Sequence, residues 1–87
     1  MSYSVFAVGT KEEAVARVVE TCDSNTSPEM PAVKNFLLSL LAAIDGDDKR
    51  VVIEANGWHS GGAVSHDIKF RTASVLIEVP PSVPLAD

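Results

Sequence analysis

Apolar residues follow a strand-like pattern at the start of the chain and a helix-like pattern directly after it. From Tyr3 to Val8, apolar side chains occur on both faces of an extended strand, which is typical of a strand inside a sheet. After Gly9, the sequence from Thr10 to Glu13 indicates a helix start, because a threonine followed three residues later by a glutamate forms a capping box. We therefore expect an amphipathic helix whose apolar stripe is Ala14, Val15, Val18, Val19 and Cys22.

A second helix is predicted after the short polar segment 23–27. Ser27 and Pro28 supply a cap and a proline at the first helical position. The helix should end at Asp45-Gly46, since glycine adopts the left-handed cap conformation without steric cost. It is apolar on nearly all sides, and its expected core stripe is Val33, Leu37, Leu40, Leu41 and Ile44.

The segments on either side of Gly61-Gly62 predict a β-hairpin with strands Arg50–Ser60 and Ala63–Arg71. A glycine pair can take the positive φ angles of a two-residue turn. Pairing across this turn places Glu54 opposite Lys69 on one face and matches apolar residues on the other. A shift of one residue would mix the two faces, so we predict this register.

The numbering of apolar positions changes from even to odd after the hairpin, as seen in Ile68 and Phe70 and then Val75, Ile77 and Val79. This change requires a bulge or bend near residues 72–74 and favours a further strand. Pro80 and Pro81 should end strand pairing. We expect a single two-layer α+β domain over residues 1–79, in the order β-α-α-β-β with a possible further strand. Two helices would cover one face of a small, mostly antiparallel sheet, and 80–87 would form an extended, proline-containing tail.

Composition and charge narrow the class of partners. The chain has 87 residues, 46% of them hydrophobic, which is enough for one soluble domain. The net charge of -5 arises before Lys49, and no basic cluster exceeds Lys49-Arg50, so neither nucleic acid nor an anionic membrane is an expected partner. The single Cys22 excludes an internal disulfide and favours an intracellular or intravirion setting. No segment is long enough to span a bilayer, and the Met1 end lacks a signal-peptide pattern.

The segment from Asn56 to Gly62 is the one stretch whose side chains could form a ligand site, since it combines Trp58, His59 and Ser60 with glycines. The alternative is that the glycines only make the turn and Trp58 packs as a hydrophobic anchor. His59 and His66 should share a face, but two imidazoles alone make a poor metal site. Ser60, His66 and Asp67 do not form a hydrolytic triad, because neighbouring side chains on a strand diverge. We expect no enzymatic activity, no catalytic residue, no metal and no cofactor.

The second face of the sheet should remain uncovered, because two helices can shield only one. It would present Val52 and Trp58 beside apolar residues of the first strand, and monomers seldom expose such a patch. We predict that another copy of the chain or a larger protein assembly covers it. The alternative is that strand twist and the tail cover the patch. The predicted partner-binding residues are Val52, Trp58, His59, Val83 and Leu85.

The segments Tyr3-Ser4-Val5-Phe6-Ala7-Val8-Gly9-Thr10-Lys11-Glu12-Glu13 and Val51-Val52-Ile53-Glu54-Ala55-Asn56-Gly57-Trp58-His59-Ser60-Gly61 resemble small uncharacterised proteins encoded by phages of actinobacteria. This resemblance implies a location in the virion or the host cytoplasm, and it supplies no functional residues. Two hypotheses follow. The first is a non-enzymatic structural, assembly or virion accessory protein that acts through protein–protein contacts and oligomerises. The second is a cytoplasmic binding module or inhibitor that captures a host protein or small ligand near Trp58 and His59.

Overall fold

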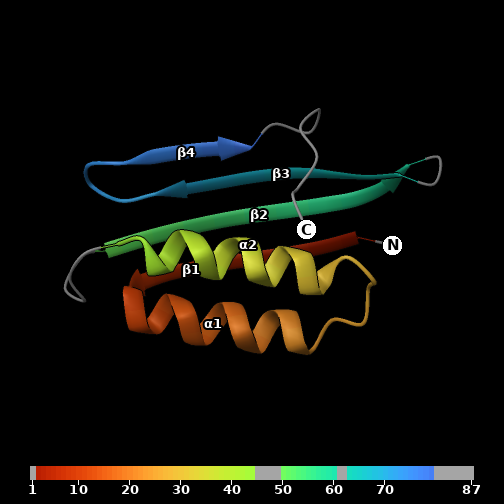
Figure 1. Ribbon diagram of the computed structural model, residues 1–87, viewed down its shortest axis with the longest axis horizontal. Helices are drawn as coiled ribbons and strands as arrows, with labels where there is room; N and C mark the ends of the chain where they lie inside the picture. Colours follow the sequence, from red (N-terminus) through yellow and green to blue (C-terminus); the bar gives the residue numbers. More distant parts are fainter. Residues whose placement is uncertain (1, 45–49, 61–62, 80–87) are drawn as a thin grey trace.

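The computed structural model describes residues 2–44, 50–60 and 63–79, and it shows two helices packed on one antiparallel sheet (Figure 1). The α+β class predicted from the sequence is confirmed, and the possible further strand is present. Along the chain the elements are β1 (Ser2–Thr10), α1 (Lys11–Asp23), α2 (Met30–Ala42), β2 (Arg50–Ser60), β3 (Ala63–Arg71) and β4 (Leu76–Val79).

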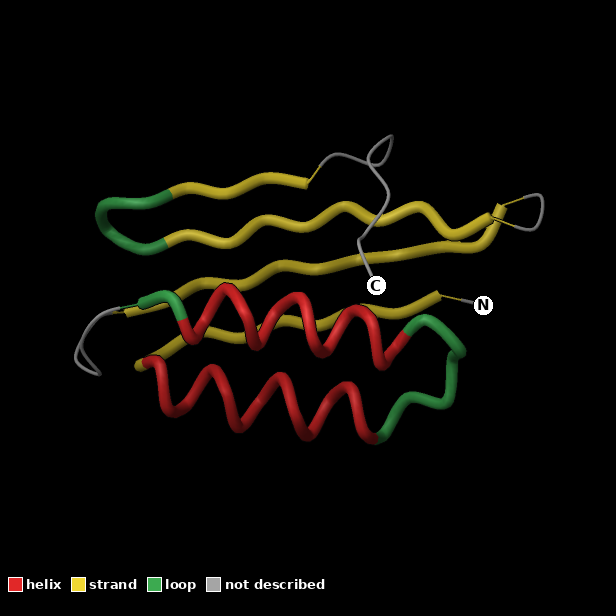
Figure 2. Tube along the Cα trace, viewed as in Figure 1, coloured by secondary structure: helices red, strands yellow, loops and turns green. Residues whose placement is uncertain are grey.

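The four strands lie in the order β1-β2-β3-β4, and every neighbouring pair is antiparallel. After β1 the chain runs back through α1 and forward again through α2, so β2 enters the sheet antiparallel to β1 (Figure 2). The predicted hairpin register is confirmed, with Glu54 opposite Lys69. The turn at Gly61-Gly62 lies outside the described residues.

The expectation that the first strand lies inside the sheet is wrong, because β1 is an edge strand of the described sheet. β4 pairs with β3 on one side of the β2–β3 hairpin. β1 pairs with β2 on the other side and has no further neighbour in the described sheet. The helices cover one face of β1, where Tyr3, Val5 and Ala7 are buried. Phe6 and Val8 on the second face of β1 are exposed. The apolar residues on both faces of this strand therefore reflect an exposed apolar surface and not a central position in the sheet.

The capping box predicted at the start of α1 is confirmed. The Thr10 hydroxyl accepts a hydrogen bond from the Glu13 backbone N–H at 3.2 Å, and the Thr10 N–H donates to the Glu13 carboxylate at 3.1 Å. Gly9 makes the corner before it with a φ of +145°, a conformation that L side chains rarely adopt. Ala14, Val18 and Cys22 then face the core.

Helix α2 begins later than predicted, at Met30 and not at Pro28. The Asn25 side chain accepts from the Ser27 N–H at 2.9 Å, and the Met30 N–H donates to the Ser27 carbonyl at 3.1 Å. These bonds hold residues 27–30 in a turn, so Pro31 takes the place expected for Pro28 in the first helical turn. The helix ends at Ala42, and the predicted stop at residues 45 and 46 lies outside the described residues.

The core lies between the sheet and the two helices. From β2 it receives Val51, Ile53 and Ala55, and from β3 it receives Ile68 and Phe70. Helix α2 contributes Met30, Val33, Leu37 and Leu41. Leu40 and Ile44, which we also expected in this stripe, are only partly buried and pack at its margin.

The predicted bend at residues 72–74 is confirmed and explains the change in apolar numbering. The Thr72 N–H donates to the Val75 carbonyl at 2.9 Å, and the Thr72 hydroxyl accepts from the N–H groups of Ser74 and Val75. The chain therefore reverses into β4, whose Ile77 and Val79 turn toward the helix side.

Candidate functional site

The sheet face that the helices do not cover is the main candidate site, and we call it the open face. Because directly paired residues in a sheet point the same way, the strand register assigns its members. The open face comprises Ser2, Ser4, Phe6, Val8, Val52, Glu54, Asn56, Trp58, Ser65, Asp67, Lys69, Arg71, Leu76 and Glu78.

Large apolar side chains stand exposed on this face. Phe6 is 60% exposed, Leu76 is 61% exposed and Trp58 is 40% exposed. Val8 is also exposed, whereas Val52 beside it is half-buried. Val8, Val52, Arg71 and Leu76 form one row across the sheet, and Phe6 lies in the next row, which ends at Glu78 on β4. The exposed apolar surface therefore lies at the β1 edge, with Phe6 and Val8, and at Leu76 on the β4 edge.

Charged residues fill the row that contains Phe6. Glu54, Lys69 and Glu78 lie side by side on β2, β3 and β4, and all three are exposed. Lys69 makes no ion pair with any other described residue. A shallow depression of about 240 Å³ lies here, lined by Val52, Glu54, Lys69, Arg71, Leu76 and Glu78. The open face is therefore a mixed surface with apolar projections, a charged row and a hollow.

Trp58 and His59 lie on opposite faces of β2, because successive side chains of a strand alternate. Trp58 belongs to the open face, whereas the His59 imidazole lies on the helix side of the sheet, 3.2 Å from the Glu29 carboxylate. A ligand bound to the open face could therefore contact Trp58 but not His59. Of the other predicted partner-binding residues, Val52 is on the open face, and Val83 and Leu85 lie outside the described residues.

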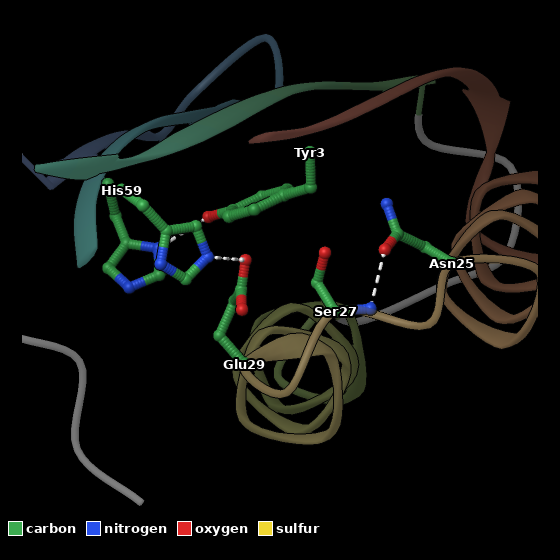
Figure 3. A network of polar contacts seen from close by, with 6 residues as sticks. Tyr3, Asn25, Ser27, Glu29 and His59 are labelled. Atoms are coloured by element: carbon green, nitrogen blue, oxygen red, sulfur yellow. Dashed lines mark hydrogen bonds and ion pairs between the residues drawn. The ribbon is translucent and has the colours of Figure 1, made fainter. Parts of the chain in front are cut away.

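A polar cluster lies on the helix-covered face, at the end of the sheet where α2 begins (Figure 3). The Tyr3 hydroxyl lies 2.6 Å from His66 Nδ1, and His59 Nε2 lies 3.2 Å from Glu29 Oε1. The Glu29 side chain is only 8% exposed, and its second carboxylate oxygen has no hydrogen-bond partner among the described residues. The alternation of strand positions predicts that His59 and His66 share a face. It does not connect them to Tyr3 and Glu29, which come close only in the folded chain.

Burial shifts the pKa values of two members of this cluster, Tyr3 and His66. It raises the pKa of Tyr3, helped by the negative charge of Glu29, so the phenol keeps its proton. The protonated Tyr3 hydroxyl and His66 Nδ1 form a hydrogen bond whose direction is set by the tautomer of the imidazole. Burial lowers the pKa of His66, although Glu29 opposes this effect. At neutral pH this pair is an uncharged hydrogen bond that fastens β1 to β3.

Gly57 makes this hydrogen bond possible. It lies between Tyr3 on β1 and His66 on β3 in the strand register. A Cβ atom at Gly57 would overlap the Tyr3 ring, at Cε2 and also at Cδ2 and Cζ. The ring therefore crosses β2 over the bare backbone of Gly57 to reach His66. The signal in the sequence is a lone glycine within an apolar strand.

The side chains that the sequence offers for chemistry lie apart in the described residues. No group of three His, Cys, Asp or Glu side chains in residues 2–44, 50–60 and 63–79 could hold a metal ion. Asp67 lies on the open face and His66 on the helix side, so they do not form the acid–base pair of a triad. Burial raises the pKa of the Cys22 thiol, which keeps it in the unreactive protonated form.

A second apolar feature is a groove of about 340 Å³ at the opposite end of the helix layer, beside the turn into β4. Leu40 and Ile44 at the end of α2 form one wall, and Phe70, Val75 and Ile77 form the other. It exists because the helices do not extend over the whole β3–β4 hairpin. None of the described residues that line it is charged.

Comparison with known proteins places this chain in no established class. No family model, no curated protein and no solved structure matches it. Among the described residues, no helix is both long and apolar enough to cross a membrane.

Proposed function

We propose that this protein is a non-enzymatic structural or assembly protein that acts through protein–protein contacts of its open face and self-associates. The observation that carries this proposal is the pair of apolar edges on that face, with Phe6 60% exposed and Leu76 61% exposed. Covering about 400 Å² of such surface would stabilise a complex by roughly 10 kcal/mol before the cost of association is subtracted. That figure is comparable with the whole stability of a small domain, which is about 5–15 kcal/mol.

The phage setting implied by residues 3–13 and 51–61 supports a role as a virion accessory or assembly factor. In that setting the partner is another copy of the chain or a larger protein assembly, in the virion or in the host cytoplasm.

The test is the mass in solution of the wild type and of Phe6→Thr. Threonine keeps the strand preference of this position but removes the apolar ring. We expect the wild type to sediment as an oligomer at micromolar concentrations and Phe6→Thr to shift toward the 9.2 kDa monomer. Ala16→Ser, at an exposed position of α1, is the matched control and should associate like the wild type. A wild type that stays monomeric at these concentrations would refute the proposal.

The second candidate function is a binding module that captures a host protein or small ligand at Trp58, and the exposure of this ring on the open face favours it. Because His59 points the other way, this candidate depends on Trp58 alone. Trp58→Ala should abolish capture of an infected-cell partner while His59→Ala leaves it unchanged, as measured by affinity purification. Equal capture by Trp58→Ala and the wild type would remove this candidate.

A further inference from the structure

We infer that the outer edge of β1 binds an extended peptide segment of another protein, which adds a strand to the sheet. The outer edge is the side of β1 that faces away from β2. No strand within residues 2–44, 50–60 and 63–79 pairs with it. This edge is a different surface from the open face, so the inference does not depend on the proposed self-association.

The direction of the backbone groups in the sheet follows from one hydrogen bond at the turn into β4. The Thr72 N–H donates to the Val75 carbonyl at 2.9 Å, so the backbone groups of Thr72 point toward the β4 side. Successive residues of a strand point their N–H and C=O groups to alternate sides, and those of Arg71 therefore point toward β2. Arg71 is paired with Val52, whose groups point back toward β3, so those of the next residue, Ile53, point toward β1.

The same alternation on β1 turns the backbone groups of every second residue outward. Ala7 is paired with Ile53 and points its groups toward β2. The residues whose N–H and C=O groups point away from β2 are then Ser2, Ser4, Phe6 and Val8. Thr10, the next member of this set, gives its N–H to the Glu13 carboxylate in the capping box, which agrees with the assignment. The outer edge therefore presents a donor and an acceptor at each of these residues.

β1 lacks the features that normally protect an edge strand. Proteins guard exposed edges with charged side chains, prolines or very short strands. The segment Ser2–Thr10 has nine residues and contains neither a charged residue nor a proline. β4, at the opposite edge, has four residues, includes Glu78 and is followed in the sequence by Pro80 and Pro81. The contrast indicates that pairing is blocked at the β4 edge and allowed at the β1 edge.

The outward groups of β1 select an extended backbone as the partner. They recur at every second residue, about 6.8 Å apart, and another strand presents its acceptors and donors at the same spacing. A segment of about seven residues would cover Ser2 to Val8 and form about eight hydrogen bonds. Its side chains would lie beside the exposed Phe6 on one face and the buried Val5 on the other. The segment should therefore be uncharged and rich in β-branched residues.

The position of α1 favours a single peptide strand over a second copy of the chain. α1 packs on β1 and lies beyond its outer edge, on the side away from β2 (Figure 1). If the β1 strands of two copies paired about a two-fold axis, each α1 would lie over β1 of the other copy. The helices of that copy already pack there. A peptide strand carries no helix and lies beside β1 without this conflict.

The direction of the backbone groups is tested first, by amide hydrogen exchange in the free protein. We expect the N–H groups of Ser4, Phe6 and Val8 to exchange at least about tenfold faster than those of Val5 and Ala7, which point toward β2. Slow exchange of Phe6 and Val8 that depends on protein concentration would mean that a second copy covers the edge. Slow exchange at every concentration would mean that the chain covers its own edge, and either result would overturn the inference.

The binding test uses a heptapeptide of alternating threonine and valine, with an acetylated N-terminus and an amidated C-terminus. Titration into isotope-labelled protein should shift the amide signals of Ser4, Phe6 and Val8 and slow their exchange at least about tenfold. The same peptide with every backbone nitrogen methylated keeps its side chains but has no N–H, so it should bind at least about tenfold more weakly. If neither peptide binds at millimolar concentrations, or if both bind equally well, the inference is wrong.

Ser4→Pro makes the matched change in the protein. Proline has no N–H and is tolerated in edge strands, so this variant removes one outward donor of β1. It should bind the heptapeptide at least about tenfold more weakly than the wild type. Ser4→Thr keeps the N–H and the hydroxyl that contacts Asn56, and it should bind like the wild type.

Equal binding of the heptapeptide by Ser4→Pro and Ser4→Thr would overturn the inference. If Ser4→Pro does not fold, the comparison of the two peptides on the wild type decides. A wild type that stays monomeric would refute the proposed function and leave this inference standing, because peptide binding at the edge needs no second copy.

Discussion

A line of three residues, Tyr3, Gly57 and His66, ties the edge strand to the hairpin. The Tyr3 ring passes over Gly57 and its hydroxyl meets His66 Nδ1 at 2.6 Å. Because Tyr3 and His66 are both buried, losing either partner would leave a polar atom without a hydrogen bond in an apolar surrounding. The role of Gly57 is to leave room for the ring, and any side chain there removes that room.

We therefore expect Gly57→Ala to lower the free energy of unfolding by about 2–3 kcal/mol, since the ring must move and the hydrogen bond to His66 is strained or lost. Urea denaturation followed by circular dichroism measures this loss. In a Tyr3→Ala background the same substitution should cost much less, because the overlapping ring is gone. An equal cost in both backgrounds would contradict this explanation.

At this scale the sequence predicted residue types better than residue partners. The alternation of strand positions placed His59 and His66 on one face, and the structure confirms it. Glu29 was not connected to them because it precedes α2, and its approach to His59 depends on how that helix packs on the sheet. Gly57 was interpreted with the glycines of the turn, since a pattern of glycines does not distinguish a bend from space for a neighbouring ring.

At the scale of helices and strands, the sequence predicted features that depend on neighbouring residues. It did not predict features that depend on contacts between distant parts of the chain. The limits of β2 and β3 and the start of α1 were predicted because turn and cap residues are adjacent to the elements they bound. The position of β1 was not predicted, since its place at the edge depends on β4 joining the far side of β3. The start of α2 was misplaced because Ser27-Pro28 and Glu29-Met30-Pro31 both fit a proline-led helix start. The Asn25 side chain decides between them.

The capping box of α1 predicts a pH dependence of stability. Hydrogen bonds from the Thr10 backbone N–H and then from the Thr10 side chain lower the pKa of Glu13 below its ordinary value of 4.5. A carboxyl whose pKa is lower in the folded state stabilises the fold above pH 4.5, and this contribution disappears as the pH falls through the folded-state pKa.

Glu13→Gln keeps a side chain that can accept the Thr10 N–H bond but cannot ionise. We expect the wild type to be the more stable of the two near pH 7, and the difference to vanish in acid. Thermal unfolding across this pH range measures it, with Glu12→Gln as the neighbouring control. A difference that stays constant with pH would show that the charge of Glu13 contributes nothing.

At the scale of the whole molecule, the chain builds a core on one side of its sheet only. One face is sealed by α1 and α2, and the other keeps Phe6, Trp58 and Leu76 exposed. The sequence predicted this imbalance by counting apolar strand positions against two helices. It did not predict the charged row, because the row exists only once β4 brings Glu78 beside Lys69.

Trp58 is the only tryptophan of the chain and lies on the open face, so it reports directly on association. We expect its fluorescence emission to move to shorter wavelength as the protein concentration rises, because a second copy removes water from the indole ring. Phe6→Thr should show no such shift at the same concentrations. If the mass doubles while the emission stays constant, Trp58 lies outside the interface.

The pairing of β1 with β2 also has a consequence for biosynthesis. β1 leaves the ribosome before the two helices, and its partner β2 follows only after them, since Ser2 pairs with Trp58. The β2–β3–β4 meander, by contrast, joins segments close in sequence and can form as soon as it is translated. Until β2 is made, the nascent β1 segment therefore has no strand partner, and Phe6 and Val8 are exposed. A chaperone, or contact between growing chains, would act in this interval.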